Sequence, residues 1–102
     1  MTTHDITMVR VYLSEGEGLL KKLLARLHDE EKVAGVTVFR GISGFGKSGR
    51  MHSSLLLDLS LDLPIVIEFF DTPEKVARII SHLEAAVPPG HIVSWSAQVH
   101  DA

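Results

Sequence analysis

Hydrophobic and polar residues alternate along Ile6 to Leu13, Gly35 to Arg40 and Ile92 to Val99. This two-residue period is the pattern of β-strands that bury one face. Ile65 to Phe70 is instead a continuous apolar run interrupted only by Glu68, which is typical of a central strand. We therefore predict four core strands, and their valines and isoleucines favour that assignment.

Two stretches between these strands have the spacing of amphipathic helices. Ser14 is the expected N-cap of the first, with Glu17 completing a capping box and Gly35 as the stop, a length of about sixteen residues. Thr72-Pro73-Glu74 is a strong start for the second, which Pro88-Pro89-Gly90 should end. The apolar faces of the two helices are Leu19, Leu20, Leu23, Leu24 and Leu27, and Val76, Ile79, Ile80, Leu83 and Val87.

The leucines between the second and third core strands also alternate. They are Leu55, Leu57, Leu59, Leu61 and Leu63. A helix would scatter them around its axis, so the pattern predicts an extended segment, interrupted near Ser60 to Pro64.

The resulting order predicts an α+β, ferredoxin-like βαββαβ fold with an antiparallel sheet. Two helices should cover one sheet face, and a long flexible loop, about residues 42–54, should join the second and third core strands. Residues 1–102 then form a single domain. The other sheet face should carry the following residues, depending on strand register: Met8, Arg10, Tyr12, Thr37, Phe39, Ser94 and Ser96. That mixture is unlike a plain solvent surface, so we expect this face to be buried against other subunits.

Composition narrows the classes of function. The net charge of −3 argues against general affinity for nucleic acid, and no apolar run approaches the roughly 20 residues of a membrane span. The chain has no cysteine, which excludes disulfides and thiolate metal sites. We expect a cytoplasmic protein without direct membrane insertion.

The glycine-rich stretch Gly41 to Arg50 satisfies two phosphate-binding patterns. Gly41, Gly46, Lys47 and Ser48 spell the P-loop G-x-x-x-x-G-K-S, and Gly44, Gly46 and Gly49 spell the dinucleotide fingerprint G-x-G-x-x-G. Both patterns need a helix directly after the loop, whereas the leucines after Arg50 alternate. A hairpin loop with glycines at tight turns is the simpler interpretation.

The whole chain supplies a further match. It carries the run Gly35-Val36-Thr37-Val38-Phe39-Arg40-Gly41-Ile42-Ser43-Gly44-Phe45-Gly46-Lys47-Ser48, then Arg50 and His52. Leu63-Pro64-Ile65-Val66-Ile67-Glu68 and Asp71 to Val87 follow. In order and spacing these segments resemble the PII-like signalling superfamily, most closely its small bacterial and archaeal branch of uncharacterised proteins of about this length.

This resemblance implies a homotrimer with inward-facing sheets and a loop that reaches a partner protein, such as a membrane transporter. It also implies an adenine nucleotide effector (ATP, ADP or AMP) in the clefts between subunits. Carried over by position, the ligand-binding residues are Arg40, Gly41, Gly44, Gly46, Lys47, Arg50, His52, Gly90 and His91. The sequence departs from the family where Pro88-Pro89-Gly90-His91 replaces a longer G-x-G-K segment.

Catalytic and metal chemistry find little support. Ser48 has no identifiable base, and Glu68 is better explained as a paired acid at a subunit interface. The six histidines lack metal-ligand spacing, although His52 and His91 flank the expected cleft. We predict no enzyme, no catalytic residue and no metal site. A small P-loop-like nucleotide hydrolase and a ligand-free adaptor trimer remain the alternatives.

Overall fold

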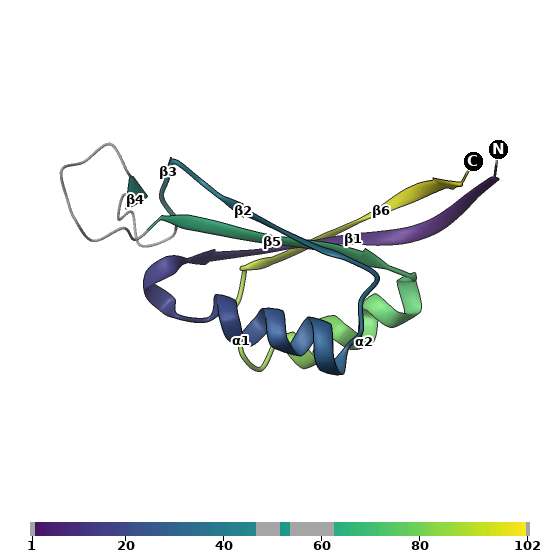
Figure 1. The fold of residues 1–102 in the computed structure, drawn as a ribbon, viewed down its shortest axis with the longest axis horizontal. Helices are drawn as coiled ribbons and strands as arrows, with labels where there is room; N and C mark the ends of the chain where they lie inside the picture. The colour runs from purple at the N-terminus through teal and green to yellow at the C-terminus, as the bar shows by residue number, and fades with distance from the viewer. Residues whose placement is uncertain (1, 47–51, 54–62, 102) are drawn as a thin grey trace.

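The computed structural model describes residues 2–46, 52–53 and 63–101. Within them, four antiparallel strands form one sheet in the order β2-β5-β1-β6, and two helices lie along one of its faces (Figure 1). The sheet strands are β1 (Thr2–Ser14), β2 (Val36–Arg40), β5 (Pro64–Asp71) and β6 (Ile92–Asp101). The predicted α+β ferredoxin-like fold is confirmed, because the first and third core strands occupy the middle of the sheet.

Among the described residues, a cluster of twelve buried apolar side chains fills the space between the helices and the sheet. It comprises Val9, Val11, Leu13, Leu23, Leu27, Ile65, Ile67, Phe69, Val76, Ile79, Leu83 and Val87. Strand register explains why the sheet residues of this core lie in one layer. Val11 and Val38 both pair with Ile67, which is fully buried. Each such aliphatic side chain contributes about 1.5–3 kcal/mol on burial, so this layer is the main source of stability.

The first helical region begins later than predicted. Glu17 does accept a hydrogen bond from the Ser14 N–H (2.8 Å), but the turn it closes is only the 3₁₀ segment η1 (Glu15–Glu17). Gly18 then adopts a left-handed φ of 68°, which ends that turn. Regular helix starts in α1 (Leu20–Ala25) and widens into the π-helical turn η2 (Arg26–Glu30).

This region also ends earlier than the predicted stop at Gly35. The π-turn closes with the Glu31 N–H donating to the Arg26 carbonyl (2.9 Å), and Lys32 then takes a positive φ of 55°. The Lys75 ammonium donates a hydrogen bond to the Lys32 carbonyl (2.8 Å), which gives this carbonyl at the helix end a hydrogen-bond partner.

The second helix, α2 (Pro73–Leu83), starts as predicted. Thr72 caps it by accepting from the Lys75 N–H (3.3 Å), and Pro73 takes the first helical position. The helix ends at Leu83, before Pro88, so the prolines do not terminate it. Instead Pro88 to His91 form a separate turn.

The sheet face away from the helices carries exposed large apolar side chains. They are Tyr12, Phe39, Val93 and Trp95, each 40–46% exposed. The prediction that Ser94 and Ser96 lie on this face is wrong: β6 pairs Val93 with Arg10 and Trp95 with Met8, which turns the serines to the helix side. We call this surface the open face.

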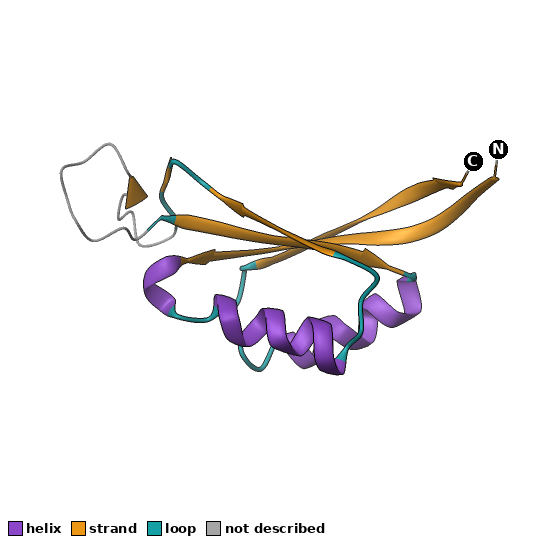
Figure 2. Ribbon diagram, viewed as in Figure 1, coloured by secondary structure: helices purple, strands orange, loops and turns teal. Residues whose placement is uncertain are grey.

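β1 and β6 continue past the rest of the sheet as a two-stranded ribbon (Figure 2). β5 pairs with β1 only as far as Thr7, whereas β6 pairs with it to Thr2. A contact between His4 Nε2 and the Asp101 carboxylate joins the ribbon near its end. The predicted extended segment Leu55–Leu61 lies outside the described residues; of those leucines the structure describes Leu63, which is buried.

Candidate functional site

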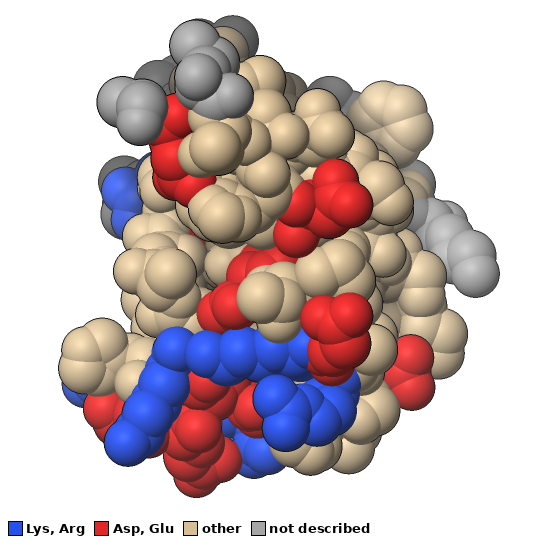
Figure 3. Space-filling view, turned by 90° about the vertical axis from the view of Figure 1, so that its right-hand side faces the viewer, with Lys and Arg blue, Asp and Glu red and all other residues tan. Residues whose placement is uncertain are grey.

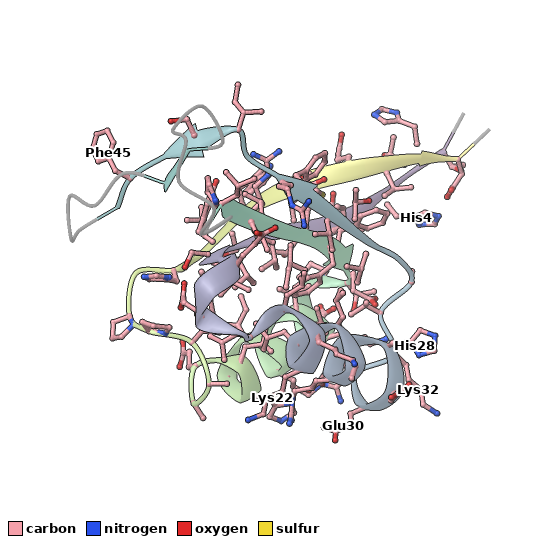
Figure 4. The ribbon with its side chains drawn as sticks, turned by 60° about the vertical axis from the view of Figure 1, so that its left-hand side comes forward. His4, Lys22, His28, Glu30, Lys32 and Phe45 are labelled. Carbon is pink, nitrogen blue, oxygen red and sulfur yellow. The ribbon has the colours of Figure 1, made fainter. Side chains whose placement is uncertain are left out.

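The glycine-rich loop connects the end of β2 to the start of β5. At its base the Gly41 N–H donates to the Pro64 carbonyl (2.7 Å). Beyond that bond a short hairpin forms from β3 (Ser43–Gly44) and β4 (His52–Ser53), where Gly44 pairs with His52. Phe45, 71% exposed, projects from it away from the body of the molecule (Figure 4).

Two glycines of the loop pack closely against one proline. A Cβ on Gly41 would lie 2.8 Å from Pro64 Cγ, and a Cβ on Gly44 would lie 3.2 Å from the same atom. Neither glycine has a positive φ. Gly46, by contrast, faces open space. The glycines at the loop base therefore serve close packing of the chain rather than left-handed turns.

Arg40, the last residue of β2, forms an ion pair with Glu15 (Nη2 to Oε1, 2.5 Å). Glu15 also donates its backbone N–H to the Leu63 carbonyl (2.9 Å) on the other side of the loop. Sequence reasoning missed Glu15 as a site residue. The sequence placed Glu15 in the predicted capping-box turn, next to Ser14. Nothing in the local sequence pattern indicated that its carboxylate lies near Arg40.

The second predicted segment is a tight turn before β6. The His91 N–H donates to the Pro88 carbonyl (3.3 Å), with Pro89 and Gly90 at the corner and Gly90 at a φ of 85°. This is a type II turn, in which proline and glycine suit the two central positions. The turn is attached to β1, because the Tyr12 N–H donates to the His91 carbonyl (2.8 Å).

The His91 ring is oriented by the same strand. Its Nδ1 lies 2.7 Å from the Tyr12 carbonyl oxygen. A carbonyl can only accept, so Nδ1 must carry the proton. Nε2 is then the ring nitrogen through which His91 would meet a ligand.

The two segments lie at the same end of the sheet but on opposite edges (Figure 1). β2 carries the loop base and β6 carries the Pro88 to His91 turn, with β5 and β1 between them. Three inter-strand spacings separate the edges by roughly 14 Å. A single chain thus brings Arg40, Gly41 and Gly44 together around Pro64 but does not join them to His91. Lys47 and Arg50 lie outside the described residues.

The hairpin weighs against both phosphate-binding patterns. A P-loop or dinucleotide fingerprint continues directly into a helix whose N-terminus binds phosphate. Here His52–Ser53 is a strand paired with Ser43–Gly44. The strand that both patterns require before the loop is present as β2. The helix that they require after the loop is not formed at His52–Ser53, which are a strand instead.

No metal site is formed by the described part of the chain, where no three His, Asp or Glu side chains come together. Figure 4 shows His4 on the ribbon and His28 at the helix layer, far from the loop. On the face in Figure 3, lysines and arginines gather over the helices with acidic residues among them, so that face has no basic patch for nucleic acid. None of the described helices is both long and apolar enough to cross a membrane.

A charged pair lies among the apolar residues of the open face. Arg10 donates to Glu68 (2.8 Å), and its guanidinium lies 6.0 Å from the Phe39 ring centre and 5.6 Å from that of Trp95. The hydrogen bond to Glu68, followed by one to Tyr12, raises the pKa of Arg10 further above its ordinary value. Glu68 is thus a paired acid on this face, and Trp95 lies outside the helix-side core.

Comparison with known proteins gives a family and a fold. The family model DUF190, described as "Uncharacterized ACR, COG1993", matches residues 6–99. A UPF0166 protein of Aquifex aeolicus is 34% identical over 82 residues, which cover 76% of this chain and 77% of that protein.

Solved structures share the fold at low sequence identity. CPII of Thiomonas intermedia K12, a nitrogen regulatory PII-like protein bound to ADP, AMP and bicarbonate, matches with a TM-score of 0.70 at 19% identity, over 98% of this chain and 100% of that one. The divalent ion tolerance protein CutA1 of Ehrlichia chaffeensis matches with a TM-score of 0.60 at 12% identity, over 95% and 83%. The resemblance to small PII-like proteins is confirmed. Since both structures share one fold, the fold alone does not identify the ligand.

Proposed function

Because the chain belongs to the DUF190 family and has a PII-like fold, we propose that it is a regulatory protein that acts as a homotrimer. In this proposal an adenine nucleotide binds between subunits, and the glycine-rich loop then alters its contact with a partner protein. The observation that carries the proposal is the position of the two candidate segments. They lie at one end of the sheet on opposite edges, so neighbouring copies can complete a site that one chain leaves divided.

The open face supports assembly through the sheets. Four large apolar side chains, Tyr12, Phe39, Val93 and Trp95, are exposed together on it. Such a patch is typical of a surface that meets another protein. Arg10 and Glu68 are already paired there, so neither charge would be buried alone.

The ligand chemistry follows from the groups at the two edges. Arg40 is a cation at the loop base with a 66% exposed side chain, and His91 presents Nε2 from the facing turn. A guanidinium suits the phosphate groups of ATP, ADP or AMP. Lys47, Arg50 and His52 are the further ligand residues of the proposal, with Gly41, Gly44, Gly46 and Gly90 shaping the backbone around them.

The loop is the proposed surface for a partner protein. Ile42 and Phe45 are 75% and 71% exposed near its base, which are high values for apolar side chains. A nucleotide held at Arg40 would bias the arrangement of the adjoining loop, an order–disorder switch of a common kind. A membrane transporter is the partner class that the PII resemblance implies.

Calorimetric titration with ATP, ADP, AMP and cyclic AMP, with and without magnesium, tests the ligand. We expect about one nucleotide per subunit, weakened at least tenfold in Arg40→Ala because a charge-assisted contact to phosphate is lost. Arg78→Ala is the matched control, since Arg78 is an exposed cation on α2. Equal weakening in both variants would contradict a role for Arg40.

Light scattering on the same samples tests the assembly. A mass three times that of the chain is expected, and a monodisperse monomer would refute a site between subunits. A trimer that binds no nucleotide would instead favour the ligand-free adaptor. The nucleotide hydrolase is the weakest alternative, because β4 occupies residues where a P-loop continues as helix.

A further inference from the structure

Glu15 connects the two ends of the glycine-rich loop. Its carboxylate pairs with Arg40, the residue just before the loop, and its backbone N–H donates to Leu63, just after it. Apart from this connection, the described loop base is closed by the Gly41 to Pro64 hydrogen bond. Glu15 therefore forms a bridge across the base of the loop, from the turn η1 that follows β1, a strand that is not adjacent to β2.

Sheet register explains how Arg40 reaches so far. Arg40 and Leu13 both pair with Ile65, from opposite sides of β5, so all three share the helix-side face. Glu15 follows Leu13 by two residues and opens the turn η1 directly after the end of β1. The arginine side chain is long enough to cross the start of β5, and its guanidinium meets the carboxylate there.

The two partners differ in their exposure. The Glu15 side chain is 20% exposed, whereas that of Arg40 is 66% exposed. The carboxylate is therefore the fixed member of the pair, and the guanidinium can be reached from solvent. Water screens the exposed guanidinium and so weakens its attraction for Glu15 Oε1, which is itself buried and has no hydrogen-bond partner among the described residues.

We propose that Glu15 is a built-in competitor for the anionic ligand of Arg40. Without ligand, Glu15 holds the guanidinium; a phosphate group, with more charge and more acceptor oxygens, takes its place. The exchange breaks the side-chain half of the Glu15 bridge, while the backbone half to Leu63 remains. Ligand binding at Arg40 thereby changes the contacts that close the base of the loop. This inference rests on the proposed nucleotide site and specifies how that site is regulated.

Glu15→Gln tests the competition, because glutamine keeps the size of the side chain and the backbone N–H but removes the charge. With ADP as the probe in calorimetry, we expect Glu15→Gln to bind about fivefold more tightly than wild type, the factor set by loss of an ion pair whose cation is exposed to water. Glu74→Gln is the matched control. It removes the same charge from the first turn of α2, at the far end of the sheet (Figure 1), and should leave ADP affinity unchanged.

A double variant ties the effect to Arg40. In an Arg40→Ala background the Glu15→Gln gain should vanish, because the competed group is gone. Amide hydrogen exchange supplies a readout of the loop base: Gly41 should exchange faster in Glu15→Gln and in the ADP complex than in the free wild type.

The outcomes separate this inference from the proposed function. If wild type and Glu15→Gln bind ADP equally while Arg40→Ala binds weakly, the nucleotide site stands and competition is wrong. Weaker binding by Glu15→Gln would also overturn competition, because Glu15 would then position Arg40 for the ligand. Binding seen only in Glu15→Gln supports it directly. If no variant binds any nucleotide, both the site and the competitor are wrong.

Discussion

Gly41 and Pro64 lie so close that no side chain fits between them. The Gly41 N–H donates to the Pro64 carbonyl at 2.7 Å, and a Cβ on Gly41 would stand 2.8 Å from the proline Cγ. This contact closes the base of the glycine-rich loop and defines where the sheet ends. The proline ring is constrained and cannot swing away as a flexible side chain would.

Gly41→Ala should therefore destabilise the fold by about 1–3 kcal/mol, the usual cost of forcing an extra methyl into a packed contact. Gly46→Ala is the control, because no atom outside its neighbours lies within 4 Å of the Cβ it would gain. Urea unfolding followed by circular dichroism measures both. Equal unfolding midpoints for the two variants would show that Pro64 can move away from an added methyl group without a cost in stability.

Trp95→Glu should convert the proposed trimer to monomers. Trp95 is 40% exposed on the open face, where a new carboxylate would remove the apolar contact and compete with Glu68 for Arg10, whose guanidinium lies 5.6 Å from the Trp95 ring centre. Ser94→Glu is the control, because this neighbour in β6 is exposed on the opposite side of the sheet. Light scattering at several protein concentrations should show a lower mass only for Trp95→Glu. An unchanged mass would place the subunit interface elsewhere.

Glu31→Gln should weaken the contact between the helices. The Glu31 carboxylate, 9% exposed, accepts from Arg26 Nε (3.0 Å) and lies 2.9 Å from His82 Nδ1 on α2. We expect a loss of about 1–2 kcal/mol in the free energy of unfolding, because charged hydrogen bonds at a largely buried acceptor become weaker.

Glu30→Gln is the comparison for that variant. Glu30 also pairs with Arg26 (3.0 Å), but its side chain is 63% exposed. Its loss should be below about 0.5 kcal/mol, since exposed helix pairs contribute little. Thermal and urea unfolding of both variants would decide the matter, and the prediction is wrong if Glu30→Gln is the more damaging.

Gly90→Ala should destabilise the Pro88 to His91 turn. Gly90 has a φ of 85°, where a side chain costs about 1–2 kcal/mol. Gly35→Ala is the control, because it has no positive φ and open space around its Cβ. Chemical denaturation gives the cost. A nucleotide titration would then show whether the turn contributes to binding, as its place in the proposed site requires.

Local patterns were sufficient for most of the secondary structure. The two-residue period located β1, β2 and β6, and the Thr72-Pro73 start of α2 was confirmed by its N-cap hydrogen bond. These features depend on neighbours within four residues, so the chain encodes them locally. The order of elements then left few sheet topologies, and the ferredoxin-like one was confirmed.

Local patterns were misleading where the backbone changed direction. The capping box at Ser14 and Glu17 formed as expected, yet Gly18 turned the chain out of the helix before Leu20. A glycine inside a helical pattern is compatible with either outcome, and the choice depends on how the leucines of α1 reach the core.

The remaining features depend on contacts between distant parts of the chain. Strand register placed Val93 and Trp95 on the open face instead of Ser94 and Ser96, because a shift of one residue exchanges the two faces. The pairing of Glu15 with Arg40 required β1, β5 and β2 to align across Ile65. The sequence alone thus established the elements and their order. Only the folded sheet decided which side chains share a face and which charges meet, because side chains from separate strands become neighbours only once the register is set.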